Sequence, residues 1–361
     1  MKSGMTLTQL ATEVERQHEA KRDYIADSRR VVMTADAKGL ELEPVGAFPM
    51  TQHAKRQLAN KLEVPATFYD RLETKHPDLL SGMVNALFRR EPMKAMVRTL
   101  DGSARCIASD SFRPLDNYDL CDAVLPSLLS IGAEVQSCDI TETKMYIKAT
   151  IPGLDRTLPV PEGAIMGQGH TIFPRALRGA ISVSTSEVGA GRLVIAPAML
   201  EKQCTNLMVF KDDGYGVIHL GKRKGQDDAI SEYFTDDTKR LEDAAIWSKV
   251  RDVIAAICAG KVMDKLVAQL LTARADIITG DPVAVVEVFG KKNLLSEEER
   301  GGLLRHLVTS GEMTRYGLQW AVTRLANDAK DYDRASDLER LGGQVIELPR
   351  TEWTELLKRA A

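Results

Sequence analysis

The stretch 94–109, KAMVRTLDGSARCIAS, decides the fold class of this chain. Apolar and polar residues alternate over 95–100 and again over 104–109, as they do in strands that have one buried face. Asp101-Gly102 lies between the two runs. This dipeptide favours the type I′ turn of a two-residue hairpin, because both residues tolerate a positive φ. The stretch therefore predicts an antiparallel β-hairpin.

The segments that follow extend this hairpin into a sheet. Apolar residues recur with helical spacing over 118–131, and a second hairpin is predicted over 134–151. Residues 94–151 then read β-β-α-β-β, and we expect both hairpins to lie in one antiparallel sheet with the helix on one face. Further strands are predicted over 177–185 and 192–197. The predicted fold class is α+β, with an antiparallel β-β-α-β-β-type sheet core.

Both ends of the chain are predicted to be mainly helical. Thr6 and Gln9 form a capping box at the start of a first helix, and helical spacing returns over 51–90 and again beyond about residue 236. Between these helices, two short strands are predicted over 30–35 and 40–42, with a turn at Lys38-Gly39. We therefore divide the 361 residues into a helical N-terminal region, an α+β sheet core and a helical C-terminal region, with bounds 1–93, 94–230 and 231–361.

Composition narrows the class of protein. Apolar residues make up 44% of the chain and charged residues 27%, so a packed core can form. No window approaches about 18 consecutive apolar residues, and the first residues lack the pattern of a secretory signal, so we expect no membrane span and no export. The five cysteines form no CxxC pair, which is typical of a reducing compartment. We expect a cytoplasmic protein.

Motifs for nucleotide, metal and hydrolase chemistry are absent from the sequence. There is no phosphate-binding loop, no GxSxG and no HExxH, and the six histidines are dispersed. The glycine cluster over 163–169 opens no predicted helix, so we interpret it as a loop. The sequence therefore predicts no cofactor and no metal.

Basic residues on the two hairpins are the most informative candidates. Lys94 and Arg98 share parity on one strand, and Lys144, Tyr146 and Lys148 share parity on another. Cations that neutralise phosphates, beside an aromatic ring that stacks on a base, are what single-strand binding needs. The alternative is an ordinary solvated face of an antiparallel sheet.

We predict that these side chains contact nucleic acid, with Tyr146 as the stacking platform. Because both hairpins are expected in one sheet, Arg98, Arg105, Lys144 and Lys148 should lie on one continuous surface. The full predicted set is Arg89, Arg90, Lys94, Arg98, Arg105, Arg113, Lys144, Tyr146, Lys148, Arg175, Arg178, Lys222, Arg223 and Lys224.

Acidic residues support an alternative function. Asp110, Asp116 and Glu187 could hold Mg²⁺ for a nuclease or another phosphoryl-transfer enzyme. A simpler interpretation is that Asp116 or Asn117 caps the helix that follows, and that Glu187 lies in a turn at the end of a strand. A third hypothesis is a protein-interaction factor that acts on a host system through the helical C-terminal third.

Three segments of the chain resemble one family. RCIASDSFRPLDNYDL, residues 105–120, resembles the LSdrYrpldN block of an uncharacterised family of phage- and plasmid-associated proteins. RGAISVSTSEVGAGRLVIAPAMLEKQCTNLM, residues 178–208, resembles its NSEvG…RlvCtNGm block, and residues 314–348 resemble its C-terminal tail. The chain departs from the family at three positions, where the family has Tyr, Asn and Gly and this chain has Phe112, Thr185 and Leu207.

The resemblance implies a setting more than a mechanism, because the family has no established activity. Its predicted core and its mobile-element setting are similar to those of phage single-strand annealing proteins, although one fold can host many functions. We therefore expect a non-catalytic protein of a phage, prophage or plasmid that binds and anneals single-stranded nucleic acid in recombination. Its expected partners are the strand, further copies of itself in a homo-oligomer, and a phage or host protein.

Overall fold

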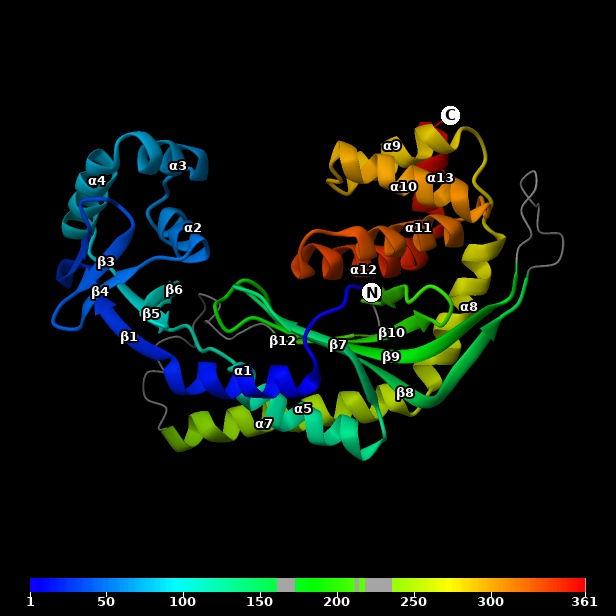
Figure 1. Cartoon of the computed structure of the whole chain (residues 1–361), viewed down its shortest axis with the longest axis horizontal. Coiled ribbons are helices and arrows are strands. Elements are labelled where there is room, and N and C mark those ends of the chain that lie inside the picture. The colour runs from blue at the N-terminus through cyan, green and yellow to red at the C-terminus, as the bar shows by residue number, and fades with distance from the viewer. Residues whose placement is uncertain (161–172, 212–213, 218–235, 361) are drawn as a thin grey trace.

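A computed structural model of the chain describes residues 1–160, 173–211, 214–217 and 236–360. Within these residues the chain is α+β, with three antiparallel sheets and helices at both ends of the sequence. It forms an N-terminal lobe, residues 22–109, and a larger body made of the other described residues (Figure 1). None of the described helices is long and apolar enough to cross a membrane.

The N-terminal lobe contains two small sheets and three helices. One sheet has the order β1-β5-β6 and the other β2-β3-β4. Their strands are β1 (Arg22–Asp27), β2 (Val31–Met33), β3 (Gly39–Leu42), β4 (Gly46–Pro49), β5 (Lys94–Leu100) and β6 (Ser103–Ser109). The helices are α2 (Gln52–Lys61), α3 (Ala66–Lys75) and α4 (Pro77–Arg90). The lobe has its own apolar core, which includes the fully buried Tyr69, Leu80 and Val84.

Local sequence signals set several of these elements. The turn between β5 and β6 is the predicted one, since Asp101 has a φ of 49° and Gly102 a φ of 76°. Thr51 caps α2 through its hydroxyl, which accepts the Ala54 N–H at 3.3 Å. Helix α1 (Leu7–Ala20), which belongs to the body, begins with the predicted capping box of Thr6 and Gln9.

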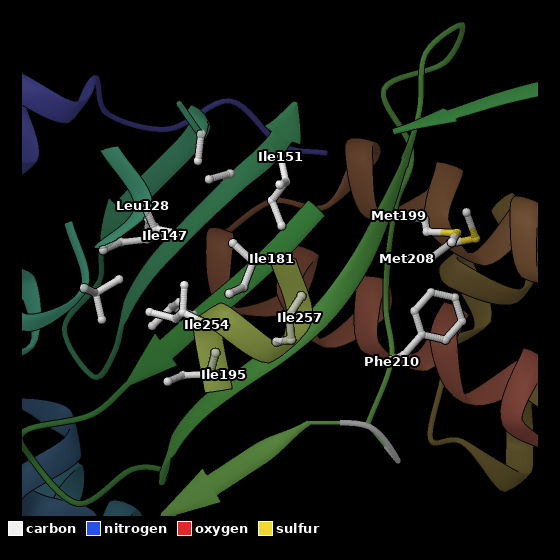
Figure 2. Close-up of a cluster of buried hydrophobic side chains, with 14 of the residues drawn as sticks. Leu128, Ile147, Ile151, Ile181, Ile195, Met199, Met208, Phe210, Ile254 and Ile257 are labelled. Carbon is white, nitrogen blue, oxygen red and sulfur yellow. The ribbon is translucent and has the colours of Figure 1, made fainter. Parts of the chain in front are cut away.

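The body is built around a larger antiparallel sheet of order β11-β10-β9-β8-β7, in which β12 also pairs with β10. Its strands are β7 (Glu134–Ile140), β8 (Met145–Leu158), β9 (Arg175–Thr185), β10 (Leu193–Glu201), β11 (Leu207–Val209) and β12 (Tyr215–Val217). One face is apolar and packs on α1, α5 (Asn117–Ser130), α7 (Asp236–Cys258) and α8 (Lys261–Ala275). Figure 2 shows Leu128, Ile147, Ile181, Ile195 and Ile254 meeting there.

The other face of this sheet carries smaller and more polar residues, and a C-terminal helical layer covers it (Figure 1). That layer consists of α9 (Pro282–Lys292), α10 (Glu297–Ser310), α11 (Arg315–Asp328), α12 (Tyr332–Glu347) and α13 (Arg350–Ala360). Helix α12 lies directly on β11. A Cβ atom at Gly343 would stand 1.9 Å from the Val209 carbonyl oxygen, and one at Gly342 would stand 2.4 Å from Thr323. The two glycines therefore allow the helix to approach both the strand and α11.

Two expectations about the layout need correction. The two hairpins do not share a sheet: β5 and β6 pair with β1 in the lobe, whereas β7 and β8 pair with β9 in the body. The region 1–93, which we described as helical, contains four strands: β2 and β3 match the short strands predicted over 30–35 and 40–42, whereas β1 and β4 were not predicted. The two missed strands are six and four residues long, and no residue in either is fully buried, so no alternation marks them in the sequence.

Candidate anion-binding site

The predicted binding stripe on β8 is not on the surface. Tyr146 and Lys148 are each 1% exposed, because α12 covers this face of the sheet. The Tyr146 hydroxyl donates to Asp333 at 2.8 Å, and Lys148 Nζ lies 2.6 Å from Glu339 and 4.2 Å from the Tyr332 ring. Burial raises the pKa of Tyr146 and lowers the pKa of Lys148, which Glu339 partly offsets. The predicted roles of a stacking platform and a phosphate contact are therefore wrong for these two residues.

The arginines of the first hairpin are buried as well, and they join the lobe to the body. Arg98 is 0% exposed and donates to Asp23 at 2.8 Å, to Asp116 at 2.7 Å and to the Glu187 carbonyl at 2.6 Å. Arg105 donates to the Glu187 carboxylate at 2.5 Å. Burial opposes the charge of Arg98, but Asp116 and Asp23 outweigh it and raise its pKa. Arg98 and Arg105 cannot contact phosphates in this arrangement, so that prediction is wrong for both.

Asp116 and Glu187 are engaged in this same junction. The Glu187 carboxylate accepts the Asn117 N–H at 3.0 Å and so caps α5. Asp116 stands at the N-cap position without making a side-chain cap, because Arg98 and Lys21 occupy its carboxylate. The first-turn amide of α5 is therefore satisfied by a residue that is distant in sequence rather than by the expected local one.

This arrangement leaves the predicted nuclease triad without a metal site. Asp116 and Glu187 are neutralised by arginines, and Asp110 is exposed on the β6–α5 connection. Across the described ranges, no group of three His, Cys, Asp or Glu side chains is placed to hold a metal ion. The geometry supports a structural role for the two buried acids.

The other predicted cations are scattered. Arg113 pairs with Glu242 and Asp243 of α7, Arg175 with Glu201 at 2.9 Å, and Arg178 with Glu134 at 4.0 Å. Three more, Arg89, Arg90 and Lys94, are exposed on the N-terminal lobe. The run Lys222, Arg223 and Lys224 and the glycine cluster over 163–169 lie outside the described residues.

Lys144 is the predicted residue that takes part in a basic groove. This groove has a volume of about 290 Å³ and lies where the body sheet meets α12. Lys144 precedes β8, Arg192 precedes β10, Lys211 follows β11, and Arg340 lies on α12. The same face of the sheet that packs under α12 supplies the floor, including Val194. We call this site the basic groove.

The described lining of the basic groove carries charges of one sign, although carboxylates of α12 lie beside it, among them Glu347, which accepts the Lys211 N–H at 2.8 Å. The lining contains four cations and no carboxylate among the described residues. Arg340 pairs with Asp337, one turn away on its own helix, and Lys144 is half-buried. A concave site lined by cations concentrates field lines and attracts anions. The floor is small and mostly apolar, so the groove suits an anion attached to a less polar group.

Sequence reasoning missed three of the four groove cations. Arg192, Lys211 and Arg340 come from a turn, a strand end and a helix, and no spacing rule connects them. The helix itself was not singled out, because Gly342 and Gly343 interrupt its helical propensity. Only the tertiary fold brings these side chains around one site.

A comparison of this chain with protein-family models, with characterised proteins and with solved structures finds no match. The resemblance to the phage- and plasmid-associated family therefore stays a prediction that rests on its segments. Two of those segments meet in space, since the first supplies Asp116 and Asn117 and the second supplies Glu187. Their residues build the junction between the lobe and the body.

Proposed function

We propose that this chain binds single-stranded nucleic acid, without cleaving it, by holding the phosphate backbone in the basic groove. The observation that carries the proposal is the convergence of Lys144, Arg192, Lys211 and Arg340 around one concave site whose described lining has no acid. Cations at a phosphate backbone release condensed counterions, and this release supplies most of sequence-independent affinity.

The size of the groove favours a single strand over a duplex. A volume of about 290 Å³ is at the lower end of ligand sites, which run from roughly 300 to 1,000 Å³, and corresponds to about one nucleotide unit. A flexible strand can bend one nucleotide into such a depression and bring its neighbouring phosphates to the other cations at the rim. A rigid duplex presents its phosphates on a convex surface and reaches only the rim.

The test is the salt dependence of oligonucleotide binding, measured by fluorescence anisotropy. Each phosphate contact on a single strand contributes about −0.7 to the slope of log affinity against log salt, so four contacts predict a slope of about −3. Affinity should therefore fall about 50-fold between about 50 and 200 mM salt. Arg192→Ala should flatten the slope by about 0.7. Arg305→Ala, which changes an exposed cation of α10 outside the groove and outside the predicted set, is the matched control and should leave the slope unchanged.

Two results contradict the proposal. One is the absence of binding at about 50 mM salt, where phosphate contacts are strongest. The other is an equal effect of Arg192→Ala and Arg305→Ala, which would place the strand elsewhere on the molecule. Cleavage of the labelled strand in the presence of Mg²⁺ would favour the alternative hypothesis of a phosphoryl-transfer enzyme.

A further inference from the structure

Two of the four groove cations lie on turns that the N-terminal lobe holds. Lys144 ends the β7–β8 turn, and Arg192 ends the β9–β10 turn. His53, near the start of α2 in the lobe, contacts both turns. Its backbone N–H donates to Glu142 at 3.0 Å, and its ring Nε2 donates to the Val188 carbonyl at 3.0 Å.

The β9–β10 turn receives further contacts from the lobe. The Val188 carbonyl also accepts from Gln57 at 2.7 Å and from the Cys106 thiol at 3.3 Å. One residue earlier, the Glu187 backbone carbonyl accepts a hydrogen bond from Arg98, and the Glu187 carboxylate accepts one from Arg105. The lobe thus forms hydrogen bonds with two consecutive residues of this turn, Glu187 and Val188, through both backbone and side-chain atoms.

Contacts within the β9–β10 turn connect the residues held by the lobe to the groove. The Ala190 N–H donates to the Ser186 hydroxyl at 2.9 Å, which closes the turn on itself. Gly189 has a φ of 77°, a left-handed conformation that reverses the chain directly after the gripped residues. A Cβ atom at Gly191 would lie 3.4 Å from Lys144 Cε, so the two turns pack against each other at the rim.

All four cations belong to the body, but the other two do not lie on the turns that the lobe contacts. Lys211 lies two residues after β11, and Arg340 lies on α12, which packs on the body sheet. A displacement of the lobe would therefore move the β9–β10 turn and Arg192 relative to Lys211 and Arg340. The β7–β8 turn is held from both sides, by His53 of the lobe and by Asp333 of α12, which accepts from the Thr141 and Thr143 hydroxyls. The distances among the four cations therefore depend on the position of the lobe relative to the body.

We infer that the N-terminal lobe sets the affinity of the basic groove for phosphate, and that Glu187 is the positioning residue through which it acts. This inference rests on the proposed function for its ligand. The coupling itself rests on the contacts of the two turns, which exist whatever the groove binds. Coupling between two sites typically amounts to about 5- to 150-fold in affinity.

The experiment compares Glu187→Gln with Glu312→Gln in the full chain. Glu312 is also a buried acid of the body; it pairs with Arg274 at 2.6 Å and does not line the groove. Each protein is measured in two ways: by the affinity and salt slope for a labelled single-stranded oligonucleotide, and by hydrogen exchange of the two turns without ligand. His53→Ala is a milder third variant, because it removes one contact to Val188 from a half-buried position.

We expect Glu187→Gln to lower the oligonucleotide affinity at least about fivefold, to flatten the salt slope, and to speed exchange in both turns. His53→Ala should shift each reading in the same direction by less, and Glu312→Gln should behave as the unsubstituted chain does. Equal affinities for Glu187→Gln and Glu312→Gln, or unchanged exchange in the turns, would overturn the inference. If the unsubstituted chain binds no strand but Glu187→Gln still loosens both turns, the proposed function fails and the coupling stands.

Discussion

The buried pair of Lys148 and Glu339 gives the strongest prediction about stability. Glu339→Gln keeps the shape of the side chain and leaves a lysine that is 1% exposed without its counter-charge. Removal of one partner from a buried ion pair costs about 3–5 kcal/mol. Lys148 keeps the Ser336 hydroxyl at 3.1 Å and the Tyr332 ring at 4.2 Å, so we expect the lower end, about 3 kcal/mol at neutral pH.

The cost should depend on pH with a definite sign. Burial lowers the pKa of Lys148 below its ordinary value of 10.5, and Glu339 opposes this shift, so its removal lowers the pKa further. The folded variant then loses the lysine proton at a pH where the unfolded chain still binds it. Stability rises with pH wherever the unfolded state binds more protons. The destabilisation should therefore be largest near neutral pH and should shrink as the pH approaches 10.5.

Urea denaturation of the variant and the unsubstituted chain, at about pH 7 and about pH 9.5, measures both effects. The control is Glu339→Gln combined with Lys148→Met, which removes both buried charges and should recover most of the lost stability. The reasoning is refuted if the single variant lies within about 1 kcal/mol of the unsubstituted chain at neutral pH, or if the double variant is less stable than the single one.

Two further predictions concern the buried polar groups. Arg98 and Lys21 hold the pKa of Asp116 below its ordinary 3.8 despite burial, so its contribution is present above that pKa and is lost as the pH falls through the lower folded value. Asp116→Asn should therefore be less stable at neutral pH and should show a smaller further loss in acid, as followed by circular dichroism. Tyr146→Phe removes the hydroxyl that donates to Asp333 and should cost about 1 kcal/mol in urea denaturation. The affinity of this variant for an oligonucleotide should be unchanged. A loss of binding without a loss of stability would instead indicate that Tyr146 contacts the strand.

The sequence predicted the features that contiguous residues determine. The Asp101-Gly102 turn and the Thr6 capping box depend on a few neighbouring residues, and both are present. Parity also placed Tyr146 and Lys148 correctly on one face of their strand, since both side chains reach α12. Parity says nothing about what covers that face. The same alternation serves a solvated surface and an interface with a polar helix.

The features that the sequence did not predict depend on partners far away in the chain. The first hairpin pairs with β1, whose residues Arg22–Asp27 are mostly exposed or half-buried and show no clear alternation. Glu187 resembled a polar residue in a strand-end turn, and it does lie in one, but its role comes from Arg105 and Asn117. A buried acid and its distant cation leave no periodic signal in one sequence.

The lack of a side chain at Gly343 also affects the ion pair of Lys148 and Glu339, which this residue does not contact. A methyl group there would meet the Val209 carbonyl and lift α12 away from the sheet. Water could then enter beneath the helix, where Lys148 and Glu339 now face each other. The effective dielectric constant would rise from about 4–20, typical of an interior, towards about 80, and the attraction between the two charges would weaken several-fold. The close packing that Gly343 permits thus excludes water from the ion pair of Lys148 and Glu339.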